Sequence, residues 1–172
     1  FERWPEMVDN VIPYIGGEEE KSEQEPLKIW GELNAEGTEI VKATAPVISA
    51  QCIRVPVSDG HLAAVSVSFE KTPTEEEIRN IWANYTTIAQ QLELPSAPTP
   101  FVTYFEEPDR PQTKPDRDIG NGMGIAVGRL RKDCTFDYKF VCLSHNTLRG
   151  AAGGGVLSAE LLCAQGYIER KE

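Results

Sequence analysis

The sequence lacks several features that define common classes of protein. Its 172 residues include 17 Lys and Arg against 27 Asp and Glu, which gives a formal net charge of −10. This acidic balance argues against binding to nucleic acid or to an anionic membrane surface. No apolar run approaches the roughly 18 residues that a membrane-spanning helix needs. No secretory or transit segment opens the chain, so we expect a cytoplasmic protein with neither nucleic acid nor membrane as a partner.

Cysteine is sparse and widely spaced. Cys52, Cys134, Cys142 and Cys163 form no CxxC pair, which weakens any interpretation as a zinc or redox motif. Cys142 and His145 have CxxH spacing, but no second pair accompanies them. We expect buried free thiols in a reducing compartment, and no metal site.

The glycines do not form a dinucleotide fingerprint. Residues 120–124 and 150–155 are both rich in glycine, but neither satisfies the GxGxxG pattern. The second cluster opens a predicted helix, where small residues let the backbone approach a ligand or another surface closely. Ordinary core packing is the alternative explanation for that cluster.

The segment from Arg54 to His61 carries the clearest chemical signal. Valines alternate with other residues on both sides of it, which predicts two strands, 45–57 and 61–69, joined by a turn at Ser58–Gly60. Arg54 and His61 can then face one concavity. Arginine binds carboxylate or phosphate through two parallel hydrogen bonds, and histidine transfers protons near neutral pH. The alternative is a solvated loop histidine and an arginine paired with a surface carboxylate.

The remaining pattern predicts an α+β fold with a mostly antiparallel sheet flanked by helices. A helix begins near Glu18, with acids at the positive end of its dipole, and breaks or restarts at Pro26. A second helix has Thr72 as its N-cap and an apolar stripe from Ile78 to Leu92 that we interpret as core. Further strands are predicted at 101–105, 123–130 and 135–143, and a last helix, capped by Asn146 or Thr147, runs to about residue 165.

Four segments, taken in order, resemble one family. They are residues 10–21 (NVIPYIGGEEEK), 54–61 (RVPVSDGH), 123–129 (MGIAVGR) and 146–153 (NTLRGAAG). The chain resembles the C-terminal half of aspartate-semialdehyde dehydrogenases of the fungal and archaeal branch, across nearly its whole length. The resemblance implies a substrate-binding and dimerisation domain at residues 1–145, of the kind that forms the C-terminal domain of glyceraldehyde-phosphate dehydrogenase. It also implies a C-terminal helix at 146–172 that packs back on a cofactor domain absent from this sequence.

The resemblance implies an activity and a set of roles. The family reduces L-aspartyl 4-phosphate to the semialdehyde with NADPH, through a cysteine thioester, in the synthesis of lysine, threonine and methionine. By similarity, Arg54 grips the α-carboxylate of the substrate and His61 is the catalytic acid and base. Glu18 meets the substrate ammonium and Lys21 its phosphate, and their spacing places both on one face of a helix.

Two further residues, Asn146 and Thr147, are expected by the same resemblance to lie near the nicotinamide of NADPH. The nucleophilic cysteine and the Rossmann domain of the family lie N-terminal to the matching segment, and none of the four cysteines sits in the nucleophile motif. We therefore expect a fragment of a longer enzyme that binds no cofactor and has no activity alone, but forms at least a dimer.

Two alternatives remain. One is a related reductase of another acyl phosphate or acyl thioester, such as malonyl-CoA reductase, although malonate has no ammonium group for an acid at position 18. The other is a domain that only dimerises and has no chemistry of its own.

Overall fold

The computed structural model describes residues 4–169. The chain forms two compact units that divide between Pro56 and Val57. Among the described residues, no helix is both long and apolar enough to span a bilayer.

The first unit is built around one helix. It contains η1 (Pro5–Met7), α1 (Glu18–Ile29) and a small antiparallel ribbon of β1 (Glu32–Leu33) with β2 (Ile40–Val41). The start of α1 at Glu18 confirms the prediction, and three acids occupy its first turn, where the helix dipole favours them.

The predicted break at Pro26 is wrong. Pro26 lies inside α1, which continues to Ile29. A proline in a helix interior removes one hydrogen bond and crowds the preceding turn. Here it stands in the last turn, and its carbonyl still accepts from the N–H of Trp30 over 3.0 Å. The proline therefore removes little of the hydrogen bonding of α1, because the helix ends three residues later.

The predicted strand at 45–57 is also wrong. Only Arg54 in this segment takes part in a β-bridge, an isolated antiparallel pair with Ile12. The backbone N–H groups of Ala50 and Cys52 donate instead to Glu23 and Glu19, two side chains of α1. These backbone donors therefore bond to side chains of a helix and not to a neighbouring strand.

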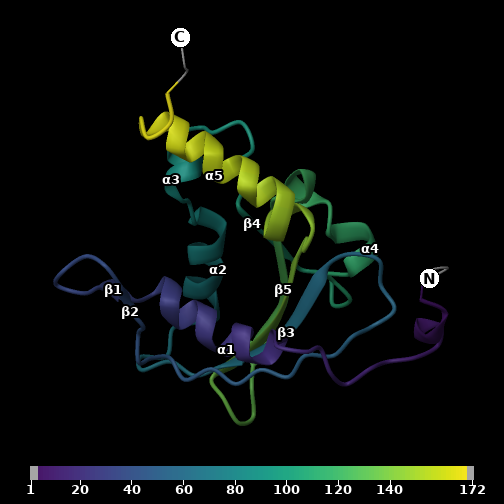
Figure 1. The fold of residues 1–172 in the computed structure, drawn as a ribbon. Coiled ribbons are helices and arrows are strands. Elements are labelled where there is room, and N and C mark those ends of the chain that lie inside the picture. The colour runs from purple at the N-terminus through teal and green to yellow at the C-terminus, as the bar shows by residue number, and fades with distance from the viewer. Residues whose placement is uncertain (1–3, 170–172) are drawn as a thin grey trace. The chain divides into compact units, whose positions relative to one another are not determined.

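The second unit contains a four-stranded sheet in the order β3-β6-β5-β4. Figure 1 labels its strands β3, β4 and β5. The strands are β3 (His61–Val67), β4 (Val102–Phe105), β5 (Ile125–Lys132) and β6 (Tyr138–Ser144). β6 pairs antiparallel with both β3 and β5, and β4 pairs parallel with β5. The prediction of a mostly antiparallel sheet in an α+β fold is confirmed, but the partner of β3 is β6 and not the segment before the turn.

The helix α2 (Glu75–Asn84) packs against this sheet. Its N-cap is Thr74, in a capping box with Glu77, two positions after the predicted Thr72. Ile78 joins the buried core, and the ring of Trp82 packs on aromatic rings of β4 and β6 at centroid distances of 5.9 and 5.2 Å. The predicted apolar stripe is core only in part, since the chain leaves α2 after Asn84 and re-enters a helix at α3 (Ile88–Gln91).

The long connection between β4 and β5 contains α4 (Thr113–Asp116) and the short turn η2 (Ile119–Gly122). Asp116 is fully buried, and its carboxylate accepts hydrogen bonds from the Arg110 guanidinium and from the N–H of Gln112. Although burial alone raises the pKa of a carboxyl group, these partners outweigh it and lower the pKa of Asp116. The loop that leads to Arg117 and Asp118 is thereby fixed.

The chain enters its last helix through a π-helical turn. η3 (Leu148–Ala152) has the wide hydrogen bonds of a π-helix, and α5 (Gly153–Ala164) follows. A Cβ added to Gly153 would lie 2.5 Å from the sulfur of Met123, so packing explains this glycine. Further along, the carboxylate of Glu160 accepts from both the N–H and the hydroxyl of Ser96, which ties α5 to the segment that follows α3.

Candidate functional site

The predicted site residues divide evenly between the two units. Glu18, Lys21 and Arg54 lie in the first unit, and His61, Asn146 and Thr147 lie in the second. Each group is held by contacts within its own unit.

Glu18 and Lys21 form the ion pair that their spacing predicts. The Lys21 ammonium lies 2.8 Å from the Glu18 carboxylate, on the first turns of α1. This hydrogen bond and the nearby negative charge raise the pKa of Lys21, which keeps the ammonium protonated. The neighbouring Glu19 faces another way, toward the N–H of Cys52. A carboxylate and an ammonium at one helix end can bind a ligand that carries both signs of charge.

Arg54 is anchored by its main chain. Its N–H and carbonyl both bond to Ile12, at 2.8 and 3.0 Å. Its guanidinium lies over the ring of Trp4, 5.2 Å from the centroid. A guanidinium stacked on an aromatic face keeps its N–H edge available for an oxyanion.

His61 is the first residue of β3, opposite Ser144 of β6. It is exposed, whereas Gly60 just before it is buried. Gly60 has a φ of +105°, and a Cβ at this position would lie 3.2 Å from the Leu143 side chain. Only glycine takes up this backbone conformation without strain, so a glycine is required directly before β3.

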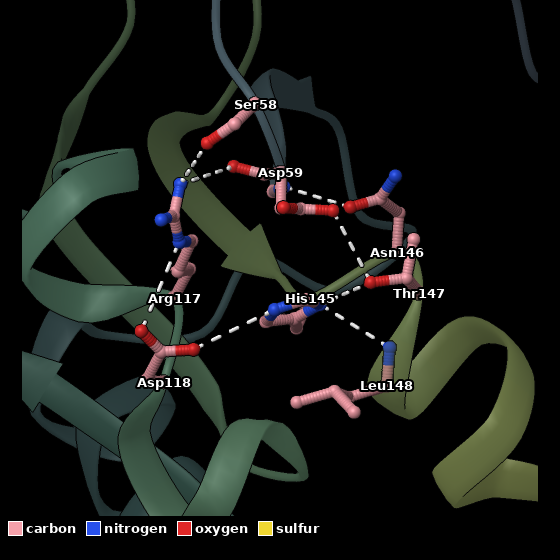
Figure 2. Close-up of polar contacts among 9 residues, drawn as sticks. Ser58, Asp59, Arg117, Asp118, His145, Asn146, Thr147 and Leu148 are labelled. Carbon is pink, nitrogen blue, oxygen red and sulfur yellow. Dashed lines mark hydrogen bonds and ion pairs between the residues drawn. The ribbon is translucent and has the colours of Figure 1, made fainter.

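The start of the last helix holds the turn before His61. The N–H of Gly60 donates to the side-chain oxygen of Asn146 over 2.7 Å, and the hydroxyl of Thr147 donates to the carboxylate of Asp59 over 3.2 Å (Figure 2). Thr147 occupies the N-cap position of η3, as predicted, but its side chain makes no capping hydrogen bond and points to the turn instead, as does that of Asn146.

Arg117 holds the other side of the same turn. Its guanidinium donates to the Ser58 hydroxyl over 2.8 Å and to the Asp59 carbonyl over 3.3 Å (Figure 2). It also lies 3.8 Å from the carboxylate of Asp118.

His145 lies between these contacts and is only 6% exposed. Its Nδ1 accepts the backbone N–H of Leu148 over 3.2 Å and lies 3.3 Å from the Thr147 hydroxyl. Its Nε2 lies 3.5 Å from a carboxylate oxygen of Asp118 (Figure 2). No sequence motif predicted that His145, Arg117 and Asp118 lie around the turn before His61. One signal in the sequence could have indicated His145: it is one of only two histidines in the chain and directly precedes Asn146.

Burial lowers the reactivity of the one thiol on the strand that pairs with β3. Cys142 stands opposite Ala63 on β6, and burial raises the pKa of its thiol. A raised pKa reduces the fraction of nucleophilic thiolate. In the part of the chain that the structure describes, no group of three or more His, Cys, Asp or Glu could hold a metal ion.

Comparisons with known proteins agree on one family. Residues 4–149 match the family model described as "Semialdehyde dehydrogenase, dimerisation domain". An aspartate-semialdehyde dehydrogenase of Schizosaccharomyces pombe is 49% identical over 95% of this chain and 46% of its own length. One from Archaeoglobus fulgidus is 46% identical over 94% of this chain and 45% of its own length. The chain therefore spans about half the length of the curated relatives it matches.

Solved structures give the same result. The crystal structure of an aspartate semialdehyde dehydrogenase with NADP from Candida albicans superposes with a TM-score of 0.84 at 44% identity, over 96% of this chain and 47% of that one. A second structure, from Vibrio cholerae, has a TM-score of 0.69 at 24% identity over 94% of this chain and 43% of its own, which supports the fold alone.

Proposed function

The chain belongs to the family of semialdehyde dehydrogenase dimerisation domains, and from this premise we propose that it is part of an enzyme that reduces L-aspartyl 4-phosphate to aspartate semialdehyde with NADPH. The observation that carries the proposal is the 40–49% identity, over at least 91% of this chain, to proteins named aspartate-semialdehyde dehydrogenase.

Three residues of the first unit bind the substrate. Arg54 holds the α-carboxylate, Glu18 the ammonium and Lys21 the phosphate. The chemistry supports these roles, because a substrate with one carboxylate, one ammonium and one phosphoryl group needs a guanidinium, a carboxylate and a second cation. The pairing of Glu18 with Lys21 at 2.8 Å keeps two of these groups side by side.

His61 acts as the acid and base. An imidazole serves this role when it is reachable by substrate and held at a defined place. Its exposure on the surface of the second unit, and the hydrogen bonds that fix the turn before it, support the role.

Asn146 and Thr147 were the expected nicotinamide contacts, and they fit this role unequally. The oxygen of Asn146 is taken by Gly60, but among the described residues its side-chain nitrogen has no hydrogen-bond partner and can donate to a carboxamide. The hydroxyl of Thr147 is already directed at Asp59. We therefore propose that Asn146 contacts the nicotinamide directly and that Thr147 holds the turn. NADPH, when bound, supplies the hydride.

The two halves of the enzyme are proposed to have different roles, because this chain lacks the family's nucleophilic cysteine. The thioester-forming cysteine belongs to the other half of the enzyme, because the four thiols of this chain lie outside the family's nucleophile motif. We propose that residues 1–145 form the substrate-binding and dimerisation domain, and that the helix of 146–172 packs on the cofactor domain. Exposed apolar side chains on and after α5 support this packing, with Val156 at 53% and Ile168 at 47% exposure.

The same family membership supports a homodimer as the minimal assembly. β3 is an edge strand of the sheet, and its Leu62 is 51% exposed. An exposed apolar edge strand is prone to pair with a second copy unless it is covered.

We further propose a cytoplasmic location, which four free cysteines support.

A domain that dimerises without chemistry of its own is the second candidate, and the match of residues 4–149 to a dimerisation domain favours it for this chain taken alone. Malonyl-CoA reduction has no such support, since Glu18 and Lys21 together match a substrate with both charges.

One assay separates these functions. The protein that contains this chain and its N-terminal half is tested for phosphate-dependent oxidation of aspartate semialdehyde with NADP, beside the 172-residue chain alone. We expect turnover only from the longer protein, and none with malonate semialdehyde and CoA. No turnover by the longer protein would refute the dehydrogenase, and turnover by the chain alone, abolished by His61→Ala, would refute the division of labour.

A further inference from the structure

We propose that His145 is a positioning residue for the proposed reaction: it fixes the start of the last helix, and with it the turn from which His61 extends. The inference rests on the proposed function for its consequence in catalysis, but its structural content concerns only the second unit.

The tautomer of His145 follows from its partners. A backbone N–H can only donate, so the Nδ1 that accepts from Leu148 must carry a lone pair. The ring proton therefore sits on Nε2, which faces the carboxylate of Asp118 at 3.5 Å. Leu148 is the first residue of η3, so this contact gives the first turn of the helix an acceptor for one of its unpaired N–H groups.

The single hydroxyl proton of Thr147 has two possible acceptors. The Asp59 carboxylate lies 3.2 Å from the hydroxyl and His145 Nδ1 lies 3.3 Å from it. Since Leu148 already occupies the lone pair of Nδ1, the Thr147 proton goes to Asp59. His145 thus directs the Thr147 hydroxyl toward the turn by leaving it no other acceptor.

A series of hydrogen bonds therefore connects the buried ring of His145 to the backbone directly before the exposed His61. His145 fixes Thr147 and Leu148, Thr147 binds Asp59, and the neighbouring Asn146 binds Gly60, which directly precedes His61. Asn146 also carries the N–H₂ group proposed to face the nicotinamide. One buried imidazole therefore holds both the proposed cofactor contact and the backbone of His61 in place. Shifts of about 1 Å in such groups can lower a rate on the order of a hundredfold.

Two substitutions of His145 separate this role from simple filling of space. Asparagine places an oxygen near the position of Nδ1, whereas glutamine places its polar group near that of Nε2. His145→Asn keeps an acceptor for Leu148, and His145→Gln loses it. Asp118→Asn is the matched control for the Nε2 side, where Asp118 is 66% exposed.

The first test is spectroscopic and needs no activity. The chain has only two histidines, so nitrogen-15 spectra of the 172-residue chain resolve both rings. We expect the Nε2–H tautomer for His145. We also expect His145→Gln to shift the His61 ring signals and to raise amide hydrogen exchange at Gly60 at least about tenfold, with His145→Asn close to the unsubstituted chain. An Nδ1–H tautomer, or equal effects of the two substitutions, would overturn the proposal.

The second test is kinetic and uses the longer protein. His145→Gln should lower kcat at least about tenfold with a smaller change in KM for semialdehyde, while His145→Asn and Asp118→Asn stay within about threefold. Equal losses in both His145 variants would contradict positioning through Nδ1. If the unsubstituted longer protein has no such activity, the proposed function fails, and the spectroscopic test alone decides the role of His145.

Discussion

The N–H of Gly60 donates to the side-chain oxygen of Asn146 over 2.7 Å, a contact that joins two residues 86 positions apart in the chain. It fastens the residue before His61 to the beginning of the last helix. Loss of the Asn146 side chain leaves a buried backbone donor without its partner.

We therefore expect Asn146→Ala to destabilise the fold. An unmet buried donor costs about 1–3 kcal/mol, which corresponds to a fall in Tm of roughly 2–8 °C in a chain of this size. Thermal unfolding of the 172-residue chain measures this change. Asn146→Asp is the control, because it keeps the accepting oxygen, and a variant as unstable as Asn146→Ala would contradict the assigned contact.

Arg54 and His61 should have different kinetic signatures in the longer protein. Arg54→Leu removes a group that binds the substrate in both the ground and transition states, so affinity and rate fall together. His61→Ala removes an acid and base, which lowers the maximal rate by roughly 10²–10⁴-fold with less change in KM. Steady-state kinetics across pH test both roles. An unchanged maximal rate for His61→Ala at every pH would disprove its assignment.

The β5–β6 turn should give the fold an acid-sensitive element. The Asp133 carboxylate accepts from the N–H groups of Thr135 and Phe136 and from the Lys139 ammonium, which lowers its pKa to about 2. Because the unfolded chain binds the proton more readily, this contribution to stability is present above a pH of about 4 and is lost as the pH falls toward 2. The urea midpoint of Asp133→Asn should lie below that of the unsubstituted chain at pH 6, and the gap should narrow at pH 3. A gap that does not change with pH would argue against an ionised Asp133 as its source.

Thiol reactivity should rank by burial. Cys134 and Cys163 are exposed, whereas burial raises the pKa of Cys142. We expect a thiol reagent at pH 8 to modify the two exposed cysteines first and Cys142 last. The folded chain also holds the Cys142 proton to a higher pH than the unfolded chain does, so its stability should fall as the pH rises above about 9. Mass spectrometry of partly modified protein identifies the order, and early modification of Cys142 would contradict its burial.

The dimer is tested by sedimentation of the 172-residue chain at micromolar concentration and moderate salt. The −10 charge opposes association, but that repulsion is screened beyond roughly 8–10 Å. An obligate interface buries on the order of 2,000 Å² or more, and the edge strand β3 would be one part of it. Leu62→Lys on β3 should favour the monomer. A clean monomer of the unsubstituted chain would refute the proposal that the 172-residue chain dimerises by itself.

The sequence predicted those helices and strands that depend on neighbouring residues. The acids at 18–20 marked the start of α1, and the apolar alternation of 123–130 and 135–143 marked the β5–β6 pair. The same alternation before Arg54 predicted a strand that does not exist, because period-two spacing says nothing about which strand is available as a partner. β3 found that partner in β6, about 80 positions later.

The site residues of the second unit also have partners that a local sequence pattern does not reveal. The turn at 58–60 was predicted from its residues, but the groups that fix it come from Arg117 and from residues 145–147. Thr147 matched the preferences of a helix cap, and the tertiary contact with Asp59 took its hydroxyl instead. Contacts across such separations depend on the assembled sheet, which no short motif encodes.

The π-helical turn of η3 makes the length of this segment critical. Its hydrogen bonds span five residues, as from the N–H of Gly150 to the carbonyl of His145, so η3 accommodates more residues than the same stretch of α-helix. Removing one residue between 148 and 152 would convert it to an ordinary α-helical turn, in which each N–H bonds to the carbonyl four residues earlier. The hydrogen bond from the N–H of Gly150 to the carbonyl of His145, beside the ring that accepts from Leu148, would then be lost. Lineages of this family should therefore tolerate substitutions here far more readily than insertions or deletions.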